Sequence, residues 1–316
     1  MPLDPPIQQL LSMLAAVGVA DMSTTTPAEA RTWFRTFTVD MRPPETVVPV
    51  GAVNDLELPG PAGPLPARRY RPQGEGPHPT IVFFHGGGFV IGDVDTHDNQ
   101  CRTLCRDVGA VVLSVGYRLA PETPWPGPVE DCLAATRWAG AHLDELGGEP
   151  AAVAVAGDSA GGNLAAVVAQ RVRDEGGPAL AAQLLIYPGV DMDDDEERYP
   201  SYTANGEGYF LTAADMRWFA DNYAAAAPDR RDPGISPLYG DLAGLPPAVV
   251  TTAEYDPLHD QGAAYAHALE DAGVPVVHLD FAGLIHGYFD MARLSPACAE
   301  AVGATCEALR ERLAAA

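Results

Sequence analysis

The sequence has 316 residues, which is long enough for one large domain with a substantial hydrophobic core. Its net charge of −24 argues against nucleic acids and anionic membranes as partners. All 19 basic residues are arginine, so mechanisms that need a lysine base, a Schiff base or a P-loop lysine are excluded. A reactive serine in this chain must therefore use histidine as its base.

Composition and the N-terminal residues also bear on location. The segment MPLDPPIQQLL lacks the basic start of a signal peptide, and no apolar run approaches ~18 residues. Five cysteines are present, and Cys101 and Cys105 lie four apart without a second cysteine or histidine cluster at metal-site spacing. We therefore expect buried free thiols, no metal, no membrane association and a cytoplasmic location.

The first 45 residues predict two helices. Apolar residues at helical spacing mark the first, and Thr26 to Glu29 forms a capping box with Pro27 at the first turn of the second. Residues 45–58 and 65–72 then have the pattern of strands, joined by the Gly/Pro-rich PGPAGP. These two strands are expected to form an antiparallel edge.

Six short apolar runs follow, most of them separated by helical stretches at 128–142, 160–175 and 258–272. The runs are 80–86, 110–117, 151–157, 181–189, 247–256 and 274–281. Strands that are apolar on both faces and joined by helices are typical of a parallel sheet covered on both sides. The sequence therefore predicts an α/β fold with eight strands, two at an antiparallel edge and six mostly parallel.

Residues 190–235 interrupt this alternation. They contain the acidic run 191–198, which we expect to be a solvated loop, with a cation site as the weaker alternative, and then an aromatic-rich helical stretch. We expect 1–45 and 190–235 to form a helical cap over the strand ends. The core would comprise 46–189 and 236–316, within one domain spanning 1–316.

The stretch AGDSAGGN places Ser159 between an apolar strand and a helix, with Gly157 and Gly161 on either side. This is the pattern of a nucleophile elbow, a turn so tight that flanking side chains must be absent. In this composition chance produces roughly 0.07 such matches per chain. Ser159 is therefore the candidate nucleophile.

A nucleophilic serine needs donors for an oxyanion, and HGGGF at 85–89 follows directly on an apolar strand. Consecutive glycines let backbone N–H groups face a site without side chains in the way. We expect an oxyanion hole from the N–H groups of Gly87, Gly88 and Ala160, the residue after the serine. His85 is expected to hold this loop in place.

The base should lie on a loop beyond a strand end. His286 lies just past the last predicted strand, between Gly283 and Gly287, and is the candidate base. His278 is the alternative, although it lies within the strand pattern and faces away from that strand's core residues.

The acid should precede the histidine in chain order, because hydrolases built on such an elbow run Ser, then Asp or Glu, then His. Asp256 ends a predicted strand and is our candidate, although Asp256 followed by Pro257 also has the pattern of a helix N-cap. Asp260 is the competing acid, but it falls within the first turn of the following helix.

With HGGGF, YRLAPE, GDSAGG, DPLHD and LIHGY in collinear order, the chain resembles the bacterial hormone-sensitive-lipase-like carboxylesterases over nearly its whole length. The resemblance implies an α/β-hydrolase core with a helical cap, and short-chain ester hydrolysis without metal or cofactor. It implies the same triad of Ser159, Asp256 and His286, and the same oxyanion hole. The family commonly has arginine at the position of His259, which leaves the triad intact.

Two other functions remain open at this stage. An amidase or deacetylase would use the same residues, and a plant gibberellin receptor of similar sequence binds its ligand after losing the catalytic histidine. The presence of His286 favours an enzyme over a receptor, whereas the sequence does not separate ester from amide hydrolysis. The partner we expect is a small-molecule ester; whether the chain forms a homodimer stays open. For the substrate pocket we expect Phe34, Phe89, Phe210 and Leu211.

Overall fold

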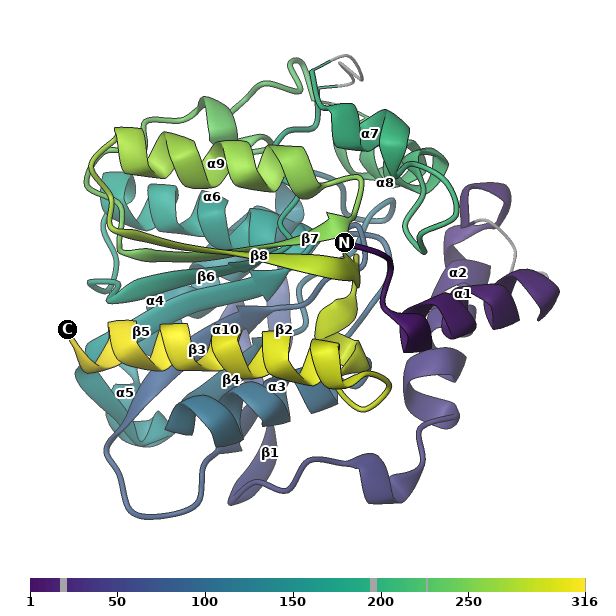
Figure 1. Cartoon of the computed structure of the whole chain (residues 1–316). Coiled ribbons are helices and arrows are strands. Elements are labelled where there is room, and N and C mark those ends of the chain that lie inside the picture. Colours follow the sequence, from purple (N-terminus) through teal and green to yellow (C-terminus); the bar gives the residue numbers. More distant parts are fainter. Residues whose placement is uncertain (18–21, 194–197, 226, 316) are drawn as a thin grey trace.

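A computed structural model describes residues 1–17, 22–193, 198–225 and 227–315 (Figure 1). Eight strands form one sheet in the order β1-β2-β4-β3-β5-β6-β7-β8, with β2 antiparallel to both neighbours and the other pairs parallel. The strands are β1 Ala52–Gly60, β2 Gly63–Arg71, β3 His78–Phe84, β4 Val111–Val115, β5 Gly148–Asp158, β6 Ala182–Ile186, β7 Ala248–Tyr255 and β8 Val276–Ile285. The predicted eight-stranded, mostly parallel sheet is confirmed.

Helices cover both faces of this sheet (Figure 1). Two buried clusters lie on opposite faces: along β3, Val82 and Phe84 belong to one, and Ile81 and Phe83 to the other. The helices α4 Gly127–Ala141, α6 Ala160–Glu175 and α9 His259–Asp271 contribute to the first cluster, and α3 Asp98–Leu104 and α10 Pro296–Ala314 to the second. This explains why the parallel strands are apolar on both sides.

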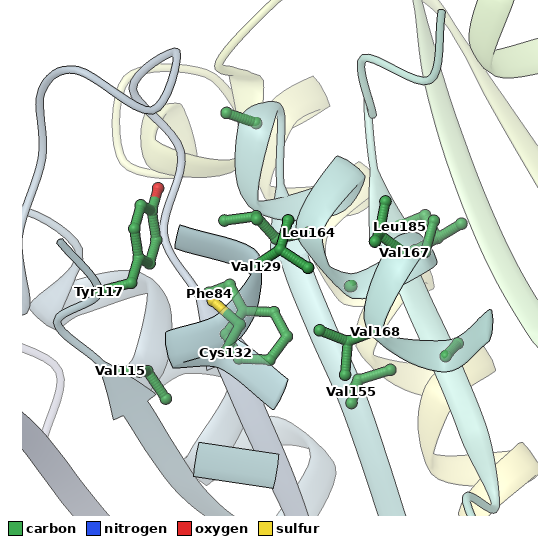
Figure 2. Close-up of a cluster of buried hydrophobic side chains, with 14 of the residues drawn as sticks. Phe84, Val115, Tyr117, Val129, Cys132, Val155, Leu164, Val167, Val168 and Leu185 are labelled. Carbon is green, nitrogen blue, oxygen red and sulfur yellow. The ribbon is translucent and has the colours of Figure 1, made fainter. Parts of the chain in front are cut away.

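The first cluster is the larger and lies beside the segment that carries Ser159. Figure 2 shows that four adjacent strands send side chains toward α6 and α4. These side chains are Phe84 of β3, Val115 of β4, Val155 of β5 and Leu185 of β6, against Leu164, Val167 and Val168 of α6 and Val129 and Cys132 of α4. Close packing of α6 on the sheet holds the N-terminal end of α6 in place.

The N-terminal helices and the segment after β6 lie at the same end of the sheet (Figure 1). They comprise α1 Pro5–Val17 and α2 Pro27–Arg35 from the first, and α7 Pro200–Ala204 and α8 Ala213–Ala224 from the second. Thr26 and Glu29 form the predicted capping box at the start of α2. The two segments touch, because the Ser23 backbone N–H donates to Asp215 Oδ1 of α8 at 3.3 Å.

Short helical segments complete the chain. They are α5 Leu143–Leu146 and the turns Met22–Thr24, Thr36–Asp40, Pro44–Thr46, Cys105–Gly109, Pro237–Tyr239 and Tyr288–Met291. All five cysteines are free and buried, as expected. In the part of the chain that the structure describes, no helix combines the length and apolar character needed to cross a bilayer.

The acidic run differs from its expectation as a solvated loop. Asp191 is buried and accepts hydrogen bonds from Arg198 at 2.7 Å and from Tyr199 at 2.7 Å. Asp193 pairs with Arg231. Residues 194–197 lie outside the described residues. The reason for the difference is pairing: Arg198 at the end of the run and the distant Arg231 neutralise its first carboxylates, so that Asp191 can pack inward.

Candidate active site

The candidate residues gather at one edge of the sheet because the carboxyl ends of parallel strands meet there. Ser159 follows β5, Asp256 follows β7, and His286 follows β8. The glycine loop that begins at Gly86 follows β3, which lies next to β5 in the sheet. Four separate segments thus converge on Ser159.

The turn at Ser159 has the geometry of a nucleophile elbow. Ser159 has φ 56° and ψ −117°, a conformation that non-glycine residues rarely adopt. A Cβ at Gly157 would overlap the backbone of Gly161, and one at Gly161 would overlap the carbonyl oxygen of Phe84. Both glycines are therefore required by close backbone approach, and the turn holds the serine at the start of α6.

The side chains of Ser159, His286 and Asp256 form a continuous hydrogen-bonded line. His286 Nε2 lies 3.0 Å from Ser159 Oγ, and His286 Nδ1 lies 2.7 Å from Asp256 Oδ2. Asp256 is fully buried, and its Oδ1 accepts the backbone N–H of Leu258 at 2.8 Å. A carboxylate at Nδ1 keeps the proton on that nitrogen, so Nε2 is free to accept the serine proton.

The alternative acid and base lie elsewhere. His278 is on β8, with Nε2 3.0 Å from Thr252 Oγ1. Asp260 lies in the first turn of α9 and accepts the backbone N–H of Ser201 at 2.8 Å. Helix α9 begins at His259 with Leu258 as its N-cap, so Asp256 does not cap the helix.

The glycine loop runs beside the elbow. Gly87 and Gly88 have φ +107° and +58°, in the region that favours glycine. Within the described part of the chain, their N–H groups donate to no protein acceptor, whereas Gly86 N–H donates to Asp158 Oδ1 at 2.8 Å. Ala160 is the first residue of α6, where backbone N–H groups lack intrahelical acceptors. These groups can supply hydrogen bonds to an anion beside Ser159.

His85 holds the start of the loop. Its Nδ1 lies 2.7 Å from the carbonyl oxygen of Gly86, and its ring stacks on Tyr117 with centroids 4.2 Å apart. Burial, and then the neighbouring His97, lower the pKa of His85 to about 4, so the ring is neutral. A neutral ring with its proton on Nδ1 can donate to that carbonyl.

A cavity of about 390 Å³ opens onto Ser159 and His286. Phe34, Phe89, Phe210 and Leu211 all line it, as does Phe219 of α8. Among the other bulky residues of the cap segments, Trp33, Tyr209 and Trp218 are not part of its wall. The walls are mainly apolar, and they come from both cap segments and from the core.

Sequence reasoning missed polar residues in the same wall: Asp158, Tyr187, His97 and Asp290. Asp158 is adjacent to the candidate nucleophile, and His97 lies only nine residues beyond Gly88, so sequence proximity could have indicated both. Tyr187 directly follows β6, and its ring centroid lies 4.6 Å from that of His286. Among the described residues, no group of three or more His, Cys, Asp or Glu side chains could hold a metal ion.

A family model described as the alpha/beta hydrolase fold matches residues 81–290, about two thirds of the chain, from β3 to the loop after His286. The chain belongs to the α/β-hydrolase family. This hydrolase is also similar to curated relatives. It is 44% identical to the carboxylic ester hydrolase LipN of Mycobacterium tuberculosis, over 98% of this chain and 83% of that protein. It is 40% identical to an ethyl acetate hydrolase of Pseudomonas putida, over 83% of each chain.

Solved structures agree with this assignment. The hydrolase superposes on a hyperthermophilic esterase from Pyrobaculum calidifontis with a TM-score of 0.94 and 40% identity, over 98% of this chain and 99% of that one. A thermostable esterase from Pseudomonas putida gives a TM-score of 0.92 at 35% identity. Similarity of this extent shows that nearly the whole chain, including residues 1–45 and 190–235, has counterparts in a solved esterase.

Proposed function

We propose that this hydrolase cleaves short-chain carboxylic esters through an acyl-enzyme intermediate on Ser159. The observation that carries the proposal is the Ser159–His286–Asp256 line at the mouth of an apolar cavity, beside unpaired N–H groups. The names of the relatives, which include an ester hydrolase and an ethyl acetate hydrolase, support the same chemistry. Five buried free thiols support a cytoplasmic location.

In the first half-reaction, Ser159 Oγ attacks the ester carbonyl carbon while His286 Nε2 takes the hydroxyl proton. The tetrahedral oxyanion accepts hydrogen bonds from the N–H groups of Gly87, Gly88 and Ala160. When the intermediate collapses, the C–O bond to the alcohol breaks and His286 returns the proton to the departing oxygen. The acyl group remains on Ser159.

In the second half-reaction, water attacks the acyl carbon and His286 takes a proton from it. A second oxyanion forms in the same place and collapses with release of Ser159 Oγ, which regains its proton from His286. Asp256 stays ionised throughout, orients the imidazole and stabilises its transient charge. The products are a carboxylic acid and the alcohol.

The cavity supports a small substrate. Its volume of about 390 Å³ is near the lower end of the range of roughly 300–1,000 Å³ for small-molecule pockets. We propose that residues 1–45 and 190–235 act as a cap that encloses this space, since both segments contribute to its wall. An enclosed apolar pocket favours a short acyl chain over a long one.

The decisive experiment combines Ser159→Ala with a serine-directed phosphonate. The variant should lose on the order of 10⁶ in turnover, because the nucleophile of a triad is removed. Intact protein should take up one phosphonate, at Ser159. The matched control is Ser12→Ala, at an exposed serine of α1, which should keep wild-type activity and labelling. Activity of Ser159→Ala within tenfold of wild type would refute the assignment.

Comparing the hydrolysis rates of an ester and an amide that carry the same acyl group distinguishes an esterase from an amidase or deacetylase. We expect the ester to be hydrolysed at least 100-fold faster, because an alkoxide leaves more readily than an amine. A preference for the amide would instead indicate an amidase or deacetylase that uses the same residues.

A further inference from the structure

A second carboxylate–histidine pair lies beneath the glycine loop and takes no part in the triad. Asp158 immediately precedes the nucleophile, and its Oδ2 lies 3.6 Å from His97 Nε2. Asp158 is 5% exposed and His97 is 2% exposed. A buried carboxylate is costly unless hydrogen bonds or an opposite charge compensate it. The pair therefore needs an explanation.

The hydrogen bonds around His97 fit a ring that is protonated on both nitrogens. The Thr96 hydroxyl oxygen lies 2.9 Å from the carbonyl oxygen of Asp93 and accepts the Asp93 N–H at 2.8 Å. The same hydroxyl oxygen lies 2.9 Å from His97 Nδ1. When the hydroxyl proton is directed at the Asp93 carbonyl, Nδ1–H is the donor to Thr96, and a second proton on Nε2 faces the Asp158 carboxylate. The geometry is therefore consistent with an imidazolium at His97.

The charges around His97 agree with an imidazolium. Asp158 faces it from the elbow, Asp290 from the turn after β8 and Asp93 from its own loop, whereas neutral His85 faces it from the end of β3. Burial by itself lowers the pKa of His97, but these carboxylates outweigh burial and the pKa is raised. Burial similarly raises the pKa of Asp158, but His97 and the Gly86 N–H outweigh it and the pKa is lowered.

The Asp158 carboxylate connects this pair to the glycine loop. Its Oδ1 accepts the Gly86 N–H at 2.8 Å, and a Cβ at Gly86 would overlap Oδ2, so carboxylate and loop backbone are in direct contact. The next two residues, Gly87 and Gly88, carry the N–H groups assigned to the oxyanion. The orientation of the Gly86 peptide thus decides where those two donors point.

We propose that Asp158 and His97 are positioning residues for ester hydrolysis: the protonated imidazole keeps the Asp158 carboxylate ionised, and that carboxylate orients the loop that binds the oxyanion. The inference rests on the proposed function, because it assigns the loop its role at Ser159. Neither side chain touches the reacting atoms. Their contribution is a fixed loop geometry before substrate arrives, which lowers the reorganisation needed in the transition state.

The kinetic test uses Asp158→Asn, which keeps the size of the side chain and removes its charge. We expect kcat to fall about 10- to 100-fold with KM within about threefold, since the loop contacts the oxyanion only in the transition state. His97→Asn should have a similar effect, and the double variant should be no worse than the more impaired single variant, because the two side chains act as one unit. Phosphonate labelling of Ser159 should slow in proportion.

The matched control is Asp131→Asn. Asp131 is another buried carboxylate, paired with Arg118 at 2.8 Å, and in the described part of the chain no hydrogen bond joins it to the glycine loop. It should lose stability while kcat stays within about twofold. If Asp158→Asn keeps kcat within twofold, or if Asp131→Asn lowers kcat equally, the positioning role is wrong. If Ser159→Ala retains activity, the proposed function itself is wrong. If Ser159→Ala is inactive but Asp158→Asn keeps its kcat, only the positioning role is wrong and the proposed function stands.

A spectroscopic readout does not depend on any Asp158 or His97 variant folding. In wild-type protein with ¹⁵N-labelled histidine, nitrogen chemical shifts distinguish imidazolium from neutral rings. As the pH is raised, we expect the His97 signals to keep the imidazolium shifts above pH 6.5, the ordinary pKa of histidine, and the His259 signals to keep them toward pH 9; His259→Gln identifies the second set. His97 signals that are already neutral at pH 6.5 would overturn the proposal.

Discussion

At the residue scale, His286 and Asp256 are hydrogen-bonded in line with Ser159. The alternative base His278 and the alternative acid Asp260 have other partners. We expect His286→Ala and Asp256→Asn each to lose at least ~10³-fold in turnover, because one removes the base and the other lets the imidazole adopt the wrong tautomer. Steady-state kinetics on one soluble ester measure this.

The matched controls for this test are His278→Ala and Asp260→Asn. His278 is hydrogen-bonded to Thr252, and Asp260 to the backbone of Ser201, both away from Ser159. The turnover of each variant should therefore stay within about tenfold of wild type. If the two pairs exchanged rank, the hydrogen-bonded line through His286 would not be the catalytic one.

The elbow glycine Gly161 gives a prediction on stability. In Gly161→Ala the new methyl group would overlap the Phe84 carbonyl oxygen, which belongs to the central strand β3 and cannot move easily. We expect a loss of at least about 3 kcal/mol in the free energy of unfolding, or no soluble protein. Denaturant titration followed by circular dichroism measures the change.

Gly303→Ala is the control, since Gly303 lies exposed on α10 with nothing within 4 Å of a new Cβ. There alanine should stabilise the protein by about 0.5–1 kcal/mol through helix propensity. A Gly161→Ala protein as stable as wild type would show that the elbow can relax.

At the element scale, His259 connects α9 with β8. Its Nδ1 lies 2.8 Å from Asp260 Oδ1, and its Nε2 lies 3.2 Å from Asp280 Oδ1. Asp260 in turn accepts the N–H of Ser201 at the start of α7. Hydrogen bonds to Asp280, opposed by burial and aided by Asp260, raise the pKa of His259 to about 9.

This raised pKa predicts a pH-dependent stability. A group whose folded pKa exceeds its unfolded value, here about 6.5, stabilises the fold fully below pH ~6.5 and loses that contribution as pH rises through about 9. His259→Gln should therefore cost about 1 kcal/mol at pH 6, after allowance for solvent screening of a partly exposed pair, and almost nothing at pH 10.

Two variants serve as controls for His259. His259→Arg cannot lose its charge, so its stability should not show this loss between pH 8 and 10. His267→Gln, at an exposed histidine of the same helix, should leave the unfolding free energy unchanged. An equal cost of His259→Gln at both pH values would contradict the assignment of the charge.

At the scale of the whole molecule, we expect the proposed cap segments and the core together to limit the length of the acyl chain. We expect hydrolysis of p-nitrophenyl esters to peak at acyl chains of about four to six carbons and to fall steeply by about twelve, because a closed pocket has a finite volume. Emulsified long-chain triglyceride should hardly be cleaved. A rate that rises at an oil–water interface would indicate a mobile lipase lid instead.

Helix α8 provides a direct way to change that limit. The ring of Phe219 lies where a Cβ on Gly88 would be, so α8 packs against the glycine loop. Phe219→Ala should enlarge the cavity and move the preferred acyl chain to longer esters by two or more carbons, as measured with the same ester series. Trp218→Ala, next to it but outside the cavity wall, should leave the profile unchanged.

Much of the site could be predicted because its chemistry is local in sequence. Gly157 and Gly161 flank Ser159 within one turn, and the glycine loop follows directly on a strand. Strand periodicity placed His286 and Asp256 beyond strand ends, and parallel strands bring such ends together. His97 and Asp158 were missed as a pair, because 61 positions separate them and only the adjacency of β3 and β5 brings them into contact.

The sequence by itself determined the fold class, the elbow at Ser159, the glycine loop and the chain order of the candidate triad, since each depends on short-range pattern and backbone geometry. Only the tertiary structure decided that Asp256 bonds to His286 and does not cap α9, that Asp191 is buried beside Arg198, and which cap residues line the cavity. These outcomes depend on contacts between distant segments. The stability of these contacts depends on which charged groups pair and which side chains pack together, and no local sequence pattern specifies those partners.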